Sequence, residues 1–150
     1  MRVVRVQLGD FDPAAEAEAL TRGRGDVGAV VTFVGLCRDE AGKLSALDLE
    51  HYPGMAEAEI ERVAEEASIR WPLAGVVAIH RFGRVRPGDR IVMVATASAH
   101  RGAAFAAAEY VMDFLKTRAP FWKRAILADG TVEAWVDATE TDDAAAARWK

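Results

Sequence analysis

The sequence predicts an α+β domain in which mostly antiparallel sheets pack against helices, and three observations lead to this fold class. Strand-like and helix-like segments are mixed without the strict β-α-β order of a parallel sheet. The 150 residues suit a single domain, which we place at residues 1–150. About half of the residues (51%) are apolar and 28% are charged, which is the composition of a globular protein. No apolar run is long enough to cross a membrane.

In the first half of the chain, turn residues separate three expected strands from two expected helices. Residues 4–8 alternate between apolar and polar, as in a half-buried strand. Asp12 followed by Pro13 is typical of a helix start, and this helix should reach about residue 21. Residues 27–36 form a buried strand that we expect to pair with a strand at 44–52 as a hairpin. A second helix should begin at Pro53, end before Pro72 and carry inward Met55, Ile60, Val63, Ala67 and Trp71.

The second half predicts two long strands, a long helix and a hairpin. The strands at 76–82 and 90–97 flank residues 86–89, which have the composition of a tight turn. Asp129-Gly130 predicts a hairpin between 121–128 and 132–136, and the Ala-rich residues 142–149 form either a short helix or a frayed end. The helix at 102–118 should stop before Pro120 and bury Phe105, Val111, Met112 and Leu115. The aromatic residues expected in the core are Trp71, Phe82, Phe121, Trp122 and Trp135.

Composition and spacing exclude several classes of site. A net charge of −4 argues against nucleic-acid binding, although it allows a local basic pocket. Cys37 is the single cysteine, which indicates a reducing cytoplasm, and we expect it to be a small buried apolar residue rather than a nucleophile. The three histidines have no metal-like spacing, so we expect neither a metal nor a cofactor. Residues 23–28 fit G-x-G-x-x-G, but a helix precedes them and a strand follows, so they form a turn.

Residues 98–102, where a strand passes into a helix, are the most informative local stretch. Backbone N–H groups at a helix start favour an anion. Arg101 adds a planar fork suited to phosphate or carboxylate, and His100 titrates near neutral pH. The local sequence alone favours the simpler alternative, a helix-entry histidine beside a solvated arginine.

Lys116 and Lys123 form a second candidate pair. On one helix they would share a face, but Pro120 lies between them, so we expect Lys123 on the following loop or strand. Two converging ammonium groups would disfavour each other's charged form, which makes a usable acid, base or nucleophile. The alternatives are a helix-ending cation and a surface lysine. Arg38 follows the strand at 27–36 and either presents a charge into a cleft or is a turn residue, and His80 is expected to be structural.

Five ordered stretches together resemble one family, the large subunit of molybdopterin synthase. The resemblance covers nearly the whole chain in the family's order. The stretches are GAVVTFVG at 28–35 with Arg38, LEHYPGMA at 49–56, HRFG at 80–83 with PGD at 87–89, SAHR at 98–101 with Phe105, and MDFLK at 112–116 with APFWK at 119–123.

This resemblance implies an α/β-hammerhead type of α+β fold and a cytoplasmic sulfurtransferase of molybdenum cofactor biosynthesis. The large subunit would form a central dimer, and each copy would bind a small ubiquitin-like sulfur-carrier subunit, giving a heterotetramer. The carrier's C-terminal Gly-Gly tail, as a thiocarboxylate, would enter a pocket. The substrate would be cyclic pyranopterin monophosphate, which receives two sulfurs as the dithiolene of molybdopterin. Neither nucleic acid nor a membrane would be a partner.

The resemblance also implies roles for individual residues. Lys116 is the expected catalytic lysine and Lys123 a second active-site cation, whereas Arg38 and Arg101 would bind anions. His100 would take part in substrate binding or proton transfer.

Two positions depart from the family's usual pattern, which has glutamate at Ala125 and often arginine near Thr139. We expect an active enzyme. The alternatives are a non-catalytic module of the same fold that binds an anionic pterin, a nucleotide or a carrier tail, and a dimeric structural domain.

Overall fold

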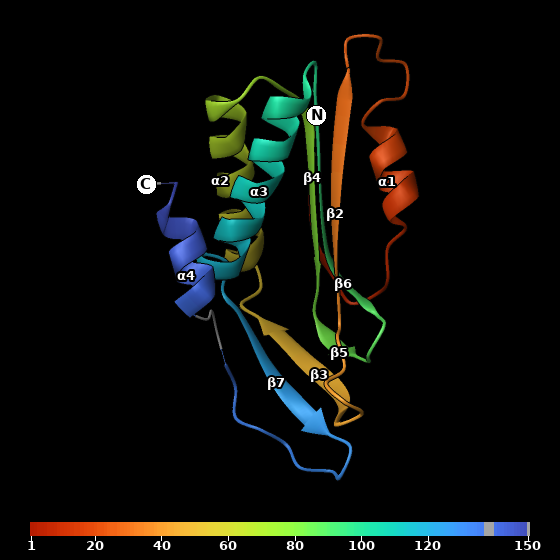
Figure 1. The fold of residues 1–150 in the computed structure, drawn as a ribbon, viewed down its shortest axis with the longest axis vertical. Helices are drawn as coiled ribbons and strands as arrows, with labels where there is room; N and C mark the ends of the chain where they lie inside the picture. Colours follow the sequence, from red (N-terminus) through yellow and green to blue (C-terminus); the bar gives the residue numbers. More distant parts are fainter. Residues whose placement is uncertain (137–139, 150) are drawn as a thin grey trace.

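Two sheets of unequal size make up the framework of the computed structural model, which describes residues 1–136 and 140–149 without the side chains of 140–142 (Figure 1). The larger sheet has the strand order β1-β4-β6-β2, with β1 parallel to β4 and the other pairs antiparallel. The smaller, antiparallel sheet has the order β5-β3-β7. The strands are β1 (Arg2–Gln7), β2 (Ala29–Leu36), β3 (Leu44–His51), β4 (Leu73–Arg81), β5 (Gly83–Val85), β6 (Arg90–Ser98) and β7 (Phe121–Leu127).

Helices cover both faces of the larger sheet. Figure 1 shows α2 and α3 on one side of that sheet, α1 on the other, and α4 against the α2–α3 layer. The predicted start of the first helix is confirmed, because the Asp12 carboxylate accepts the N–H groups of Ala14 and Ala15. The Ala-rich tail forms a short helix rather than a frayed end. The helices are α1 (Pro13–Ala19), α2 (Met55–Arg70), α3 (Arg101–Thr117) and α4 (Glu140–Ala147). None of the described helices is long and apolar enough to span a membrane.

The predicted hairpin between residues 27–36 and 44–52 is wrong. Strand β2 pairs with β6, whereas β3 belongs to the smaller sheet and pairs with β5 and β7. The backbone N–H of Cys37 donates to the Asp89 carbonyl at 2.8 Å, and the Gly88 N–H donates to the Cys37 carbonyl at 2.8 Å. These bonds tie the end of β2 to the turn before β6, so the chain leaves the larger sheet before β3 begins.

The buried core lies on both faces of β4 and β6. On the face under α2 and α3, Ala78 and Val94 pack in one cluster with Ile60 and Val111, and Val77, Ile79 and Met93 pack on the opposite face with Phe11 and Leu20. Three side chains expected inward are exposed instead, and the fractions are 53% for Met55, 62% for Phe105 and 44% for Trp135. The buried stripe of α3 runs through Ala104, Ala108 and Val111, so small residues bring the helix close to the sheet and Phe105 falls outside the stripe.

The predicted hairpin after β7 is confirmed as a turn but not as two full strands. Gly130 has a φ of 90°, and the Leu127 N–H donates to the Thr131 carbonyl at 2.8 Å. The returning segment touches β7 through isolated bridges at Val132 and Val136. It therefore runs back along β7 without forming a regular strand.

Candidate active site

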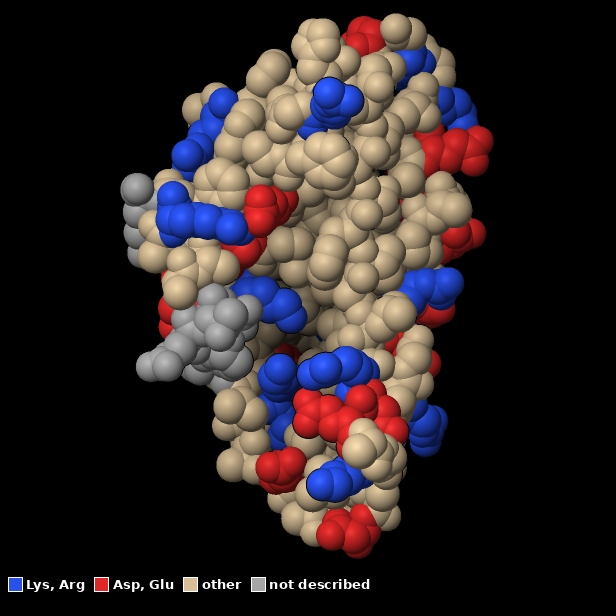
Figure 2. Space-filling view, in the orientation of Figure 1, with Lys and Arg blue, Asp and Glu red and all other residues tan. Residues whose placement is uncertain are grey.

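A cavity of about 590 Å³ lies where the two sheets meet. Figure 2 shows a hollow there, with Lys and Arg side chains gathered around it. Four cationic side chains line the cavity with two acidic ones and one histidine, and apolar residues complete the wall. The polar lining residues are Arg38, Lys43, Lys116, Lys123, Glu40, Glu133 and His80.

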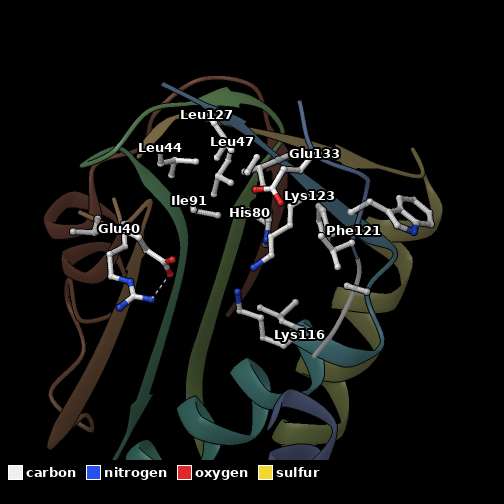
Figure 3. Close-up of a pocket in the computed structure, with 18 of the residues that line it drawn as sticks. Glu40, Leu44, Leu47, His80, Ile91, Lys116, Phe121, Lys123, Leu127 and Glu133 are labelled. Carbon is white, nitrogen blue, oxygen red and sulfur yellow. Dashed lines mark hydrogen bonds and ion pairs between the residues drawn. The ribbon is translucent and has the colours of Figure 1, made fainter. Parts of the chain in front are cut away.

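The two candidate lysines converge in this cavity. Lys116 lies in the last turn of α3 and Lys123 on β7, where it pairs with Leu49 of β3. Pro120 separates the two elements, as expected from the sequence. Of the loop and the strand that we considered for Lys123, the structure shows the strand. Figure 3 shows both side chains pointing toward one another from opposite sides of the cavity.

Arg38 also lines the cavity, from the segment that joins the two sheets. Its side chain is 82% exposed, and its Nη2 atom lies 3.1 Å from Oε1 of Glu40. The neighbouring Cys37 is 2% exposed. Burial raises the pKa of the Cys37 thiol, and the charges of Asp89 and Asp39 act in the same direction. Since a thiolate is the nucleophilic form, this environment supports the prediction that Cys37 is a packing residue.

His80, expected only as a structural residue, forms part of the cavity wall. It is 7% exposed, its Nδ1 atom lies 2.7 Å from the Arg81 carbonyl oxygen, and its ring stacks on Phe121 with 3.8 Å between centroids. Burial lowers the pKa of His80 to about 4, against the opposing effect of the Arg81 carbonyl, and the charges of Lys116 and His51 lower it further. The imidazole is therefore neutral at neutral pH.

A carboxylate reaches the cavity although position 125 is an alanine. The segment after the turn at Gly130 brings Glu133 beside Ala125, where the Glu133 N–H donates to the Ala125 carbonyl at 2.9 Å. Glu133 lines the cavity, and Figure 3 shows its carboxylate among the labelled lining residues. Sequence reasoning missed Glu133 and Lys43 because only the pairing of distant segments brings them here. Thr139, the other departure, lies outside the described residues.

His100 and Arg101 do not join this group within one chain. His100 is the N-cap residue of α3 and Arg101 its first residue, whereas Lys116 lies in the last turn. A helix rises about 1.5 Å per residue, so Arg101 and Lys116 are roughly 20 Å apart. Figure 1 shows the α3 N-terminus at the end of the larger sheet away from β7. Both side chains are exposed, as the simpler alternative for this pair predicted.

A family model described as MoaE protein matches residues 6–118. The chain belongs to the MoaE family. The molybdopterin synthase catalytic subunit of Mesorhizobium japonicum is 65% identical over 98% of this chain and 92% of its own length. The molybdopterin biosynthesis MoaE protein of Burkholderia ambifaria has a solved structure with a TM-score of 0.85, at 53% identity over 99% of this chain and 98% of that one.

A more distant MoaE-like fold occurs in the protein–protein complex of subunits 1 and 2 of molybdopterin-converting factor from Helicobacter pylori. Its TM-score is 0.70, and it covers 91% of this chain and 90% of that one. At 22% identity this likeness shows a shared fold alone. Membership of the MoaE family confirms the resemblance drawn from the five motifs, and the two-sheet architecture confirms the α+β fold class.

Proposed function

We propose that this chain is the catalytic subunit of a molybdopterin synthase and acts as a sulfurtransferase in the cytoplasm. It would transfer sulfur from the thiocarboxylated Gly-Gly terminus of a small ubiquitin-like carrier subunit to cyclic pyranopterin monophosphate. Two rounds of transfer would form the dithiolene of molybdopterin. The observation that carries this proposal is the convergence of Lys116 and Lys123 in a cationic cavity of a MoaE-family chain.

The chemistry of the two reactants explains the need for cations. A thiocarboxylate and a cyclic phosphate are both anions, so they repel each other unless fixed positive charges surround them. Lys116 and Lys123 enter the cavity from two different elements, and Arg38 stands at its rim. Fixed ammonium and guanidinium groups also stabilise negative charge that develops in the transition state. We assign catalysis to Lys116 and Lys123 and anion binding to Arg38.

His100 and Arg101 would complete the site from a second copy of the chain. The edge strand β2 spans the distance between the two ends of α3: Ala29 pairs with Ser98 near His100, and Leu36 lines the cavity. A two-fold axis across β2 would reverse its direction and set the His100 end of one copy beside the cavity of the other. Outward apolar side chains favour such a contact, and they are Val30, Phe33, Leu36 and Phe105.

The carrier subunit would bind at the cavity mouth. Its anionic tail matches the cationic lining, and the H. pylori complex shows that this fold occurs with a second type of subunit. The rival function is a non-catalytic module that binds an anionic pterin, a nucleotide or a carrier tail. Its support in the sequence is the pair of departures at Ala125 and Thr139. The support from Ala125 is weaker because Glu133 brings a carboxylate to the same wall.

The test is product formation from thiocarboxylated carrier and cyclic pyranopterin monophosphate, followed by mass spectrometry. We expect Lys116→Ala to lower the rate by at least about 100-fold, because it removes a preorganised cation from the site. Arg22→Ala, which removes an exposed cation from the turn that follows α1, should leave the rate unchanged. No product from the wild type, with the carrier shown to bind, would favour the non-catalytic module.

A further inference from the structure

His80 occupies a position in the larger sheet where an apolar side chain would be expected. It lies two residues after Ala78, so the two side chains share the face of β4 that α2 and α3 cover. Its partner on β6 is Val92, which belongs to the same buried cluster. A polar ring at the end of an apolar layer costs free energy unless its nitrogens are used.

One ring nitrogen of His80 has a defined use. Nδ1 lies 2.7 Å from the carbonyl oxygen of Arg81, and a carbonyl oxygen only accepts hydrogen bonds, so Nδ1 must carry the hydrogen. In the neutral ring the lone pair is then on Nε2.

The imidazole ring of His80 is held in the wall of the cavity. His80 is 7% exposed and belongs to the cavity wall together with Lys116. The ring plane is held by Phe121, whose ring stacks on it at 3.8 Å and an interplanar angle of 19°. Nε2 is therefore an acceptor with a fixed direction.

The charged side chains that line the cavity indicate which hydrogen-bond donor can reach Nε2 of His80. The cationic side chains of the cavity are donors only, and of the two carboxylates Glu40 is already bound to Arg38. The ammonium of Lys116 is close enough for its charge to act on the imidazole of His80. Because Nδ1 already donates to Arg81, the side of the ring that attracts a cation is Nε2.

We infer that His80 is a positioning residue whose Nε2 accepts a hydrogen bond from the ammonium of Lys116 and holds it in the cavity. A lysine has a long flexible stem, and a fixed neutral acceptor restricts where its ammonium can lie without removing its charge. The consequence for activity rests on the proposed function, whereas the hydrogen bond itself does not. Loss of positioning should lower kcat and leave KM nearly unchanged, because the charges that bind the anions remain.

Two variants separate positioning from packing. In His80→Asn, the amide N–H can still donate to the Arg81 carbonyl, but no acceptor is left at the place of Nε2. In His80→Gln, the longer side chain can place its carbonyl oxygen there. We expect kcat to fall by about 10- to 100-fold in the asparagine variant and by less than about threefold in the glutamine variant. Equal losses in both, in proportion to their thermal stability, would make His80 a packing residue and overturn the inference.

Nitrogen NMR of the full chain tests the hydrogen bond without substrate. The chain has three histidines, so ¹⁵N-histidine labelling gives few signals, and His80→Asn identifies those of His80. At neutral pH we expect protonated Nδ1 and unprotonated Nε2, and a shift of the Nε2 resonance in Lys116→Met that Arg22→Ala does not cause. The opposite tautomer, or an unmoved Nε2 resonance in Lys116→Met, would refute the hydrogen bond. An inactive wild type with the expected spectrum would instead contradict the proposed function.

Discussion

At the scale of single residues, the buried neutral imidazole of His80 makes the stability of the fold depend on pH. Its pKa is about 4 in the folded protein, against the ordinary value of 6.5 in the unfolded chain. Between these values the unfolded chain binds a proton that the folded protein does not, so stability falls as the pH falls. The charges of Lys116 in α3 and His51 in β3 lower the pKa of His80 further. The full effect is about 3 kcal/mol between pH 6.5 and 4.

The measurement is urea unfolding of the wild type and His80→Asn at pH 7.5 and pH 5. In the wild type, His80 should contribute a loss of about 2 kcal/mol over this interval, since one pKa unit corresponds to about 1.4 kcal/mol. The asparagine variant lacks this contribution, so its stability should change less. An identical change in both proteins would mean that His80 does not titrate at the expected pH.

The candidate residues that the sequence identified are those whose positions have local causes. Lys116 lies in the last turn of a helix, Pro120 follows that helix, and Arg38 follows a strand, so their positions were recognisable from their neighbours. The roles of Lys116 and Arg38 came from the family resemblance. His80 and Glu133 reach the cavity through contacts distant in sequence. His80 is covered by Phe121 of β7, and Glu133 depends on pairing across a turn. No local pattern specifies such contacts.

At the scale of secondary-structure elements, Gly28 sets how closely β2 approaches the junction between β6 and α3. Its N–H donates to the Ser98 carbonyl at 3.0 Å, and a Cβ at this position would lie 2.2 Å from the Ala99 carbonyl oxygen. Gly28→Ala should therefore push apart two backbones and destabilise the protein by about 2 kcal/mol or more. The junction carries His100 and Arg101, so activity should fall as well.

Gly25→Ala is the matched control, because nothing lies within 4 Å of a Cβ there and its backbone needs no positive φ. Thermal and urea unfolding of both variants measure the difference. A stability of Gly28→Ala equal to that of Gly25→Ala would contradict the close approach of the two backbones.

Helix ends were easier to predict than strand partners. Asp12, Pro13 and Pro120 act on adjacent residues, which places the limits of α1 and α3 close to the expected ones. Pairing in the smaller sheet depends instead on charges far apart in sequence. Asp48 of β3 lies opposite Arg84 of β5 and Arg124 of β7, and its carboxylate is within 3.2 Å of both guanidinium groups. These ion pairs join residues far apart in sequence, so no local pattern indicated that β3 pairs with β5 and β7 rather than with β2.

At the scale of the whole molecule, the net charge is negative whereas the lining of the cavity is mostly positive. The chain carries a net charge of −4, but the cavity between the two sheets is lined by four cationic side chains against two acidic ones. Figure 2 shows that much of the face above the hollow lacks charged side chains. Composition therefore predicted a globular protein that does not bind nucleic acid. The cationic cavity depends on the position of β7 beside the end of α3, which composition does not specify.

The proposed second copy makes a prediction about mixtures of two inactive proteins. Lys116→Ala and Arg101→Ala should each be inactive alone, because every site of either dimer lacks one cation. In a dimer that contains one chain of each kind, one site carries both substitutions and the other carries neither.

Mixing the two proteins in equal amounts under conditions that exchange subunits should therefore restore about a quarter of the wild-type rate, since half of the dimers are mixed and each has one intact site. Mixing either protein with itself is the control, and size-exclusion chromatography with light scattering follows the exchange. If Arg101 acts at the cavity of its own chain, mixed dimers contain no intact site and the mixture stays inactive. Recovery of activity would thus assign Lys116 and Arg101 of one site to different chains, in agreement with the roughly 20 Å that separate them along α3.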